Sequence, residues 1–422
     1  MATFVAVFGL ASVRRVHLGI LMFSAACVVG VTLAGMPLKE VVGGFPVGIL
    51  MLVVGVTYFF GIAQVNGTTD RVIGALLTST AATPRAVPVL FFALAAVTAA
   101  MGSPQAGLVT APIGMSVARR AAVDSVLMAI AINCGISAGA FAPTSLFGIV
   151  TYRIARGAGI DLNPFTLLAV AVAANLVLLV VALALFARGP VRAQHEQSTD
   201  VGVETIVASH ERTEEARRPL GALQVATVVC MALLVASIVT ATLIGVEPEL
   251  GVVALGLGAT VTLIDPASGS RAFARIDWST AFVVGGVVTF VGVLQQLGSV
   301  DLLGRAAMSI GTPLVAAVVV CMIASLVSAF ASTTAVLAAL VPLAVPLASS
   351  GRVAGWALIT ALGVCATVVD ASPFSNTGAT LVASALEDER PRLRAQLLRW
   401  GLSMVLVGPL LLVPLLVLLS GR

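Results

Sequence analysis

The sequence nearly repeats itself, and each copy interrupts an apolar segment at the same two places. Pro112 and Pro143 lie 31 residues apart in the first copy, and Pro342 and Pro373 have the same separation in the second. An offset of 230 also relates the residues around them, pairing Gly102, Ser103, Pro104, Ser145 and Gly148 with Ser332, Thr333, Thr334, Ser375 and Gly378. Upstream the offset becomes 231, which aligns Gly61, Gln64, Gly67 and Asp70 with Gly292, Gln295, Gly298 and Asp301. The pattern predicts two structural repeats, each broken twice.

The composition predicts a polytopic membrane protein. Hydrophobic residues make up 59% of the chain and charged residues only 10%, whereas soluble proteins carry about 25% charged residues. The apolar run from Leu18 to Gly35 follows Arg14 and Arg15, and no small-residue cleavage site comes after it. We therefore expect a retained first span in place of a signal peptide, and a lipid bilayer as the surrounding medium.

Charge and cysteine usage exclude several other classes. The formal net charge of +4 does not indicate nucleic acid as a partner, because the basic residues lie in short loops. All five cysteines fall inside apolar segments without paired spacing, so neither a disulfide framework nor a transition-metal site is expected.

Apolar runs and their interruptions predict the fold class. Continuous runs indicate spans at 18–36, 43–63, 164–187, 220–244, 249–264, 279–297 and 394–419. The centrally interrupted regions 84–118 and 313–350 suit re-entrant hairpins, and the proline-broken regions 121–157 and 353–388 suit single crossings made of two half-helices. Short amphipathic pieces at 67–82 and 299–311 suit interfacial arms. The prediction is an all-α membrane protein of about nine crossings plus two hairpins.

The repeat also predicts the domains and the topology. We expect a first repeat at 1–187, a cytoplasmic linker at 188–219, an extra span at 220–244 and a second repeat at 245–422. Five crossings separate the span 18–36 from its partner at 249–264, and an odd number inverts the second copy, as in many secondary transporters.

The distribution of charge agrees with this topology. With the N-terminus in the cytoplasm, 17 of the 23 basic residues fall on the inner side and 6 on the outer side, a positive-inside bias. The expected location is the inner membrane, with the C-terminus outside. The linker holds 11 of the 42 charged residues and is expected to be solvated, with a regulatory role as the alternative.

The four breaks are the predicted site. Non-helical backbone survives in hydrocarbon only where it is buried in protein or lines a cavity. A half-helix that restarts there presents free N–H groups and the positive end of its dipole, which suit an anion. The side chains at the breaks add hydroxyl and amide groups, from Ser103, Thr144, Ser145, Ser332, Thr333, Thr334, Ser375, Asn376 and Thr377. No Arg or Lys is expected in the core around the breaks. The same oxygens could hold a sodium ion.

Two further polar residues stand out inside predicted spans. Asp370 precedes Pro373 by three residues, and its first-copy equivalent is Ala140. An intramembrane carboxylate is costly and suggests a function, here binding of a coupling ion or a proton. The alternative is that Asp370 caps the following half-helix. Asn133 could face the site or join two helices by a hydrogen bond.

Three segments carry a resemblance to a known family. The stretches ASTTAVLAALVP (331–342), DASPFSNTGAT (370–380) and GVTYFFGIAQVNGTTD (55–70) resemble the ion transporter superfamily. The nearest branch is that of the MatC-type malonate/dicarboxylate carriers, related to the divalent anion–sodium symporters. The resemblance covers nearly the whole chain. It implies elevator-type transport of a small dicarboxylate, coupled to sodium or protons and performed by a homodimer, with no cofactor.

The resemblance also implies roles for individual residues. In that superfamily the hairpin tips bind substrate carboxylates with a Ser-Asn-Thr-type motif, and the broken-helix loops help to hold sodium. The substrate-binding residues would be Gly102, Ser103, Pro104, Ser332, Thr333, Thr334 and Asn376. The ion-coupling residues would be Pro143, Thr144, Ser145, Asp370, Pro373, Ser375, Thr377 and Asn133. The second tip here reads Ser-Thr-Thr, and the first tip keeps one hydroxyl.

Other functions fit the sequence less well. An inorganic anion transporter or a cation/proton exchanger on the same scaffold is the alternative within transport. An intramembrane enzyme would need a metal cluster or a serine with a positioned base, and the sequence contains neither pattern. A channel would need a charged ring or a filter sequence.

Overall fold

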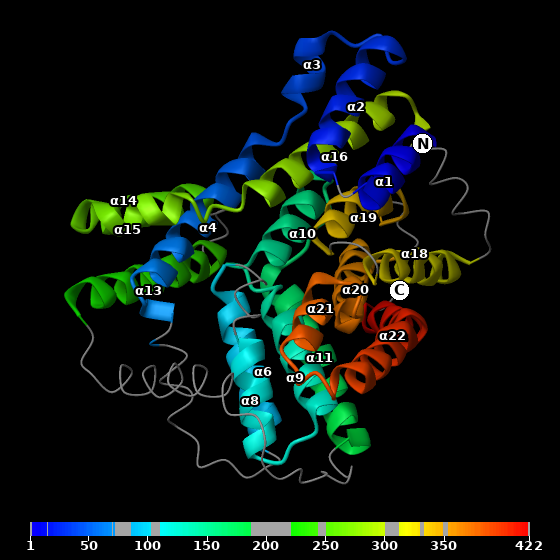
Figure 1. Cartoon of the computed structure of the whole chain (residues 1–422). Helices are drawn as coiled ribbons and strands as arrows, with labels where there is room; N and C mark the ends of the chain where they lie inside the picture. The colour runs from blue at the N-terminus through cyan, green and yellow to red at the C-terminus, as the bar shows by residue number, and fades with distance from the viewer. Residues whose placement is uncertain are drawn as a thin grey trace.

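The computed structural model describes residues 2–14, 16–69, 71, 86–102, 110–186, 221–243, 250–299, 312–329, 333–348 and 353–420. Every regular element in these ranges is helical (Figure 1). The first half contains α1 (Ala2–Arg14), α2 (Leu18–Thr32), α3 (Leu38–Gly43), α4 (Val47–Val65), α6 (Ala86–Ala100), α8 (Thr110–Arg120), α9 (Ser125–Gly139), α10 (Leu146–Gly157) and α11 (Pro164–Phe186). The second half contains α13 (Ala222–Leu243), α14 (Leu250–Ile264), α15 (Pro266–Phe273), α16 (Trp278–Gln296), α18 (Pro313–Ser328), α19 (Thr333–Ala348), α20 (Gly355–Val368), the 3-10 turn η1 (Val369–Ala371), α21 (Asn376–Ala383) and α22 (Arg390–Leu419).

The helices confirm the predicted repeat. α9 and α20 begin at Ser125 and Gly355, and α10 and α21 begin at Leu146 and Asn376, so both pairs are 230 residues apart. α4 and α16 begin at Val47 and Trp278, 231 residues apart. The order from α2 to α11 therefore recurs from α14 to α22, with the same slip of one residue upstream of the hairpins.

The lengths of the helices agree with an all-α membrane protein. In the described residues, five helices are long and apolar enough to cross a membrane, namely α4, α11, α16, the broken helix Gly355–Ala383 and α22. Shorter apolar helices include α2, α6, α9, α14 and α18. Each predicted span, hairpin arm and half-helix has a helix within its range.

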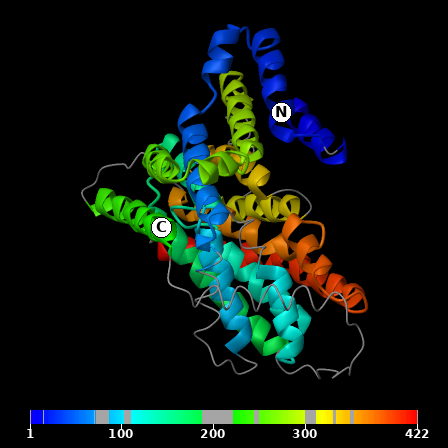
Figure 2. The same ribbon diagram turned by 60° about the vertical axis from the view of Figure 1, so that its left-hand side comes forward.

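Helices of the two repeats pack closely against each other where they cross. α2 packs along α16, and their repeat equivalents α14 and α4 pack in the same way (Figures 1 and 2). Glycines allow the contact: a Cβ added to Gly286 would lie 2.1 Å from the carbonyl oxygen of Gly19, and one added to Gly55 would lie 2.1 Å from that of Gly251. Small residues are common where membrane helices meet, because the backbones can approach.

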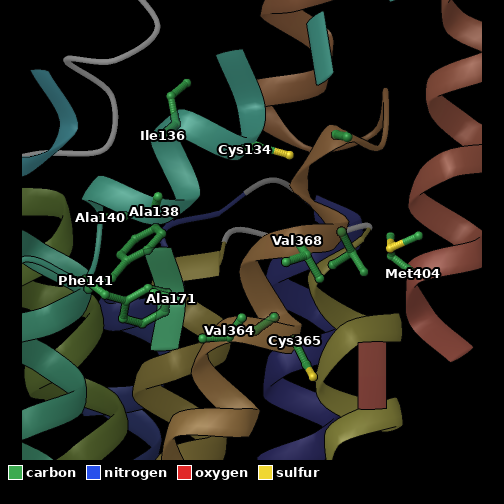
Figure 3. Packing of buried hydrophobic residues seen from close by; sticks show 14 of the residues in the cluster. Cys134, Ile136, Ala138, Ala140, Phe141, Ala171, Val364, Cys365, Val368 and Met404 are labelled. Carbon is green, nitrogen blue, oxygen red and sulfur yellow. The ribbon is translucent and has the colours of Figure 1, made fainter. Parts of the chain in front are cut away.

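The hydrophobic side chains form one large core and two smaller ones. The large core joins mainly the hairpin arms α6, α18 and α19 to α9, α20, α11 and α22. Its centre is α9, in which every residue from Val126 to Gly139 is buried. Figure 3 shows this packing, with Cys134 on α9, Val368 on α20 and Met404 on α22 among its side chains. The smaller cores lie around α2 with α16 and around α4 with α14.

Three short helices were not predicted from the sequence. These are α1, α3 and α15, which flank the predicted spans. The sequence signal for α15 is Asp265 followed by Pro266: the carboxylate accepts a hydrogen bond from Ala267 N at 3.2 Å, and proline favours the first helical position. Hydrogen bonding to Ser268 lowers the pKa of this exposed carboxyl. The predicted linker 188–219 and most of the two arms, 67–82 and 299–311, lie outside the described residues.

Candidate substrate and ion site

The second broken helix folds around a tight loop between η1 and α21. Ser375 caps α21, because its hydroxyl oxygen accepts a hydrogen bond from Gly378 N at 3.0 Å. The same hydroxyl lies 2.5 Å from the carbonyl oxygen of Asp370 and 2.9 Å from that of Ser372, and it donates to this pair. A Cβ at Gly378 would lie 2.0 Å from the Ser372 oxygen, so the loop needs glycine there. Ser375 and not Asp370 is thus the cap of this half-helix.

The Asp370 carboxylate instead joins the broken helix to the second hairpin. Thr333, the first residue of α19, donates its hydroxyl hydrogen to Asp370 Oδ1 at 2.5 Å. The Thr333 hydroxyl also lies 3.1 Å from that of Ser328, the last residue of α18. Asp370 is 7% exposed, and the ion pairs formed among the described residues do not include it. One hydroxyl therefore links both hairpin arms to a buried carboxylate.

The first broken helix makes different contacts although its sequence is related. The hydroxyls of Thr144 and Ser145 donate to the carbonyl oxygens of Ala100 and Ala99 at 2.6 and 2.8 Å. Leu146 N, at the start of α10, donates to the carbonyl oxygen of Gly102 at 3.1 Å. The hydroxyls of this loop thus tie the broken helix to the end of α6. Ala140 stands where the second copy has Asp370, so this loop carries no carboxylate at that position.

The other predicted site residues differ in their exposure. Thr334 is buried beside Thr333, Pro143 and Pro373 are half-buried, and Thr377 is partly exposed. Asn376 is exposed at the first position of α21. Ser103, Pro104 and Ser332, which were predicted in the hairpin tips, lie outside the described residues.

Asn133 is buried and lies on the face of α9 that meets the second broken helix. It is 1% exposed, and neither its amide nitrogen nor its amide oxygen has a hydrogen-bond partner in the described structure. Ser137, one turn later on the same helix face, donates to the carbonyl oxygen of Thr367 on α20 at 3.1 Å. Among the described residues, Asn133 thus forms no interhelical hydrogen bond, which was one of the two predicted roles.

One cation approaches the second loop from outside the core. The Arg394 guanidinium on α22 is exposed and lies 5.8 Å from the ring centre of Phe374 in this loop. Phe374 is 49% exposed, so this cation–π contact covers the outer side of the loop. Arg394 lies on the helix that follows the loop, and sequence spacing alone did not reveal this contact.

Ser328 and Ser137 were missed because a serine in an apolar helix commonly bonds back to its own helix, so its residue type alone does not indicate a partner elsewhere. The repeat contains a signal for Ser328, since Thr98 occupies the equivalent position of the first hairpin, 230 residues earlier. Thr98 bonds to its own helix at the carbonyl oxygen of Leu94, 2.9 Å away. Thr98 and Ser328 therefore form a matched pair of hydroxyls near the ends of α6 and α18. The match marks the position in both hairpins, although the hydrogen-bond partners differ.

Comparisons with known proteins agree with the fold and with a transporter. The family model described as the N-terminus of the dicarboxylate carrier protein MatC matches residues 1–140, and the model described as a citrate transporter matches residues 243–420. The crystal structure of the Alcanivorax borkumensis YdaH transporter, described as having an unusual topology, is similar to this chain with a TM-score of 0.57 and 14% identity. The similarity covers 97% of this chain and 98% of the YdaH chain. No curated protein sequence matches the chain significantly.

The repeated helices, the apolar helices of span length and the two family models, both of transporters, define the chain as a polytopic membrane transporter and not an enzyme. The two family models extend this conclusion across both repeats. Both models describe carriers of carboxylates.

Proposed function

We propose that this protein is a secondary active transporter of a small dicarboxylate of the malonate or succinate type. The family models that match its two halves are both named for carriers of carboxylates. The bond of Thr333 to Asp370 supports the proposal at the level of the site, because it joins a protonatable carboxylate to the first turn of α19. The substrate would bind between the two tips, against hydroxyls and half-helix N-termini.

The charge of Asp370 provides a route to coupling. A dianionic substrate and an ionised carboxylate repel each other strongly in a buried site of low dielectric. A proton or a sodium ion on Asp370 would remove that repulsion, so the cation and the substrate would each raise the affinity for the other. Transport would then require both, and the cation gradient would drive the substrate.

Thr333 would respond to the charge of Asp370. Its single hydroxyl hydrogen can be donated to one strong acceptor at a time. While Asp370 is ionised, that hydrogen is directed at the carboxylate, as the 2.5 Å bond illustrates. Neutralising Asp370 would free the donor for a substrate carboxylate, with Thr334 buried beside it. Asn133, whose amide oxygen and nitrogen have no partner in the described structure, would complete the ion site from α9.

Alternating access would follow an elevator motion. The large core holds most of the hairpins and the broken helices, whereas the smaller cores are built mainly on α2 with α16 and on α4 with α14. Val150 of α10 and Ala338 of α19 reach into the α2–α16 core, so an elevator motion would exchange these contacts as one body slides against the other. We propose that the α2, α4, α14 and α16 unit forms the fixed scaffold in a homodimer, with the N-terminus in the cytoplasm of the cell.

The test is uptake into proteoliposomes. Radiolabelled malonate and succinate are offered separately, with an inward sodium gradient and an inward proton gradient imposed one at a time. The proposal expects accumulation above equilibrium with one of the gradients and none without either. Accumulation of sulfate or phosphate but of no dicarboxylate would overturn the substrate class, and equilibration that ignores both gradients would overturn coupling.

A further inference from the structure

A cavity of about 400 Å³ lies outside the proposed transport site, between the α2–α3 region and the last turns of α16. Its lining includes Glu40, Val41, Gly44, Thr289, Gly292 and Gln295. It lies within the unit formed by α2 and α16, at the end of both helices. Neither the hairpins nor the broken helices contribute to it.

The equivalent place in the other half is filled by this chain itself. The repeat offset of 231 pairs Gly44 with Arg275, Gln295 with Gln64, and Gly292 with Gly61. Arg275 Nη1 donates to Gln64 Oε1 at 3.1 Å, so a guanidinium occupies the groove between α15 and α4.

The packing explains why one groove is full and the other hollow. A Cβ at Gly61 would lie 3.4 Å from the carbonyl oxygen of Ala272, because α15 lies close to α4. A Cβ at Gly292 would have no neighbouring atom within 4 Å. Gly44 stands at the position that Arg275 has in the other half, so no side chain from the end of α3 fills the cavity. Gln295 is exposed where Gln64 has its guanidinium partner.

The residues that line the cavity beside α3 suit a cation that donates hydrogen bonds. Glu40 contributes a carboxylate, and Gln295 and Gln296 contribute amide oxygens, while no Arg or Lys is among the lining residues. In the filled groove the position of Glu40 is taken by Arg271, so the two grooves differ in charge as well as in space. A group with several N–H donors and a positive charge matches these acceptors.

We infer that this cavity binds the ammonium headgroup of phosphatidylethanolamine, seated where Arg275 places its guanidinium in the other half. α16 is long and apolar enough to cross a membrane, so its last turn lies near the level of lipid headgroups. Val28 and Val31 on α2, Leu33 after it and Leu38 at the start of α3 are 44–68% exposed and offer a surface for acyl chains. Lys39, next to Glu40 and exposed, can meet the lipid phosphate.

The headgroup's hydrogens distinguish this lipid from phosphatidylcholine. A primary ammonium donates three hydrogen bonds, whereas the quaternary ammonium of choline has the same charge and donates none. Acceptors such as the Glu40 carboxylate and the Gln295 amide therefore favour ethanolamine, by about ten-fold for one charge-assisted bond.

The test compares lipid retention by native mass spectrometry after purification from nanodiscs with equal parts of phosphatidylethanolamine, phosphatidylcholine and phosphatidylglycerol. The wild type is expected to retain phosphatidylethanolamine about ten-fold over phosphatidylcholine. Gly44→Arg, which restores the side chain of the filled groove, is expected to abolish that preference. Gly44 has a φ of −71°, which any residue adopts, and Gly44→Ala serves as the matched control that leaves the cavity open.

Further variants keep the result interpretable if Gly44→Arg folds poorly. Glu40→Gln and Gln295→Leu are expected to lower the preference, and Gln64→Leu in the filled groove is expected to leave it unchanged. Equal retention of the three lipids by the wild type would overturn the inference, as would a preference that survives Gly44→Arg. A change in oligomeric state with Gly44→Arg, but none in lipid retention, would assign the groove to a second copy of the chain and overturn it too.

Discussion

Ser137 on α9 donates its hydroxyl hydrogen to the carbonyl oxygen of Thr367 on α20, 3.1 Å away and 230 residues later in the chain. The two residues are therefore equivalents of each other in the two repeats. A residue that touches its own equivalent lies beside the pseudo-two-fold axis, so this axis passes between α9 and α20. The contact between the two segments continues at Gly363 of α20, where an added Cβ would lie 3.0 Å from the Phe141 ring.

Asn133 and Asp370 lie on the same side of the Ser137–Thr367 contact, and so on the same side of this axis. From the 137–367 contact to the 141–363 contact, residue numbers rise on α9 as they fall on α20, so the segments run antiparallel. Four residues back from Ser137, Asn133 is level with the region after Thr367, which is η1 with Asp370. The pseudo-two-fold relation thus places Asn133 of the first repeat at the level of Asp370 of the second, although the two positions are not equivalent.

The first prediction concerns the charge of Asp370. Asp370→Asn keeps an acceptor for Thr333 but loses the charge, so substrate binding should persist within about three-fold while uphill accumulation is lost. Binding is measured by titration calorimetry and accumulation by proteoliposome uptake under each gradient. Because Ser375 caps α21, the fold should tolerate the change. Full gradient-driven accumulation by the variant would show that Asp370 does not couple transport.

The second prediction concerns the hydroxyl of Thr333. Thr333→Ala should raise the KM for uptake about ten-fold, the effect of one charge-assisted hydrogen bond, whereas Thr333→Ser should stay near the wild type. Thr260→Ala is the control, since this exposed hydroxyl bonds only to its own helix at Gly256. An unchanged KM in Thr333→Ala would remove the second hairpin tip from the site.

The third prediction tests the amide of Asn133. A buried amide without partners costs about 1–3 kcal/mol, so Asn133→Leu should maintain or raise the Tm of the purified protein. Ion dependence of uptake should nevertheless disappear if the amide completes the ion site. Thermal unfolding and sodium-dependent or pH-dependent uptake are measured on the same sample. A lower Tm together with unaltered ion dependence would instead assign Asn133 to packing.

The fourth prediction addresses the helix crossings of the scaffold. Gly251→Ala would place a Cβ 2.5 Å from the Leu52 backbone and should lower stability by about 1–3 kcal/mol or more. Gly256→Ala, on the same helix α14, meets no atom within 4 Å and should be neutral or slightly stabilising. The comparison of the two Tm values cancels helix propensity. Equal values would show that α14 and α4 do not pack at Gly251.

The fifth prediction concerns topology. Single cysteines at Ser198 and Ser420, introduced after removal of the five native cysteines, should react with an impermeant reagent from opposite faces of the membrane. The reason is the odd number of predicted crossings between them. Labelling of intact cells and of inverted vesicles gives the two sides. Reaction of both from one face would contradict the predicted crossings.

The sequence alone determined the repeat and its offset, the membrane as the surrounding medium, and the positions of the four breaks. These are properties of local composition and spacing: Pro143 and Pro373 stand with other helix-breaking and polar residues between apolar half-helices, and apolar runs of span length need a membrane. Proline alone is not sufficient, because Pro409 and Pro414 lie inside the continuous helix α22. The boundaries of α9, α10, α20 and α21 followed within a few residues. The family could be inferred too, because its motifs are short and continuous.

Only the tertiary structure decided which hydroxyls meet which partners. Ser145 and Ser375 are equivalent in sequence, yet one bonds across to Ala99 and the other to its own loop at Asp370. Likewise the sequence shows only that Gly44 and Arg275 differ at equivalent positions. The structure shows the consequence, a cavity beside Gly44 and a guanidinium bonded to Gln64 in the other half. The physical reason is that a side-chain hydrogen bond depends on ångström distances between helices far apart in the chain, and those distances are set by packing at contacts such as Gly55 with Gly251.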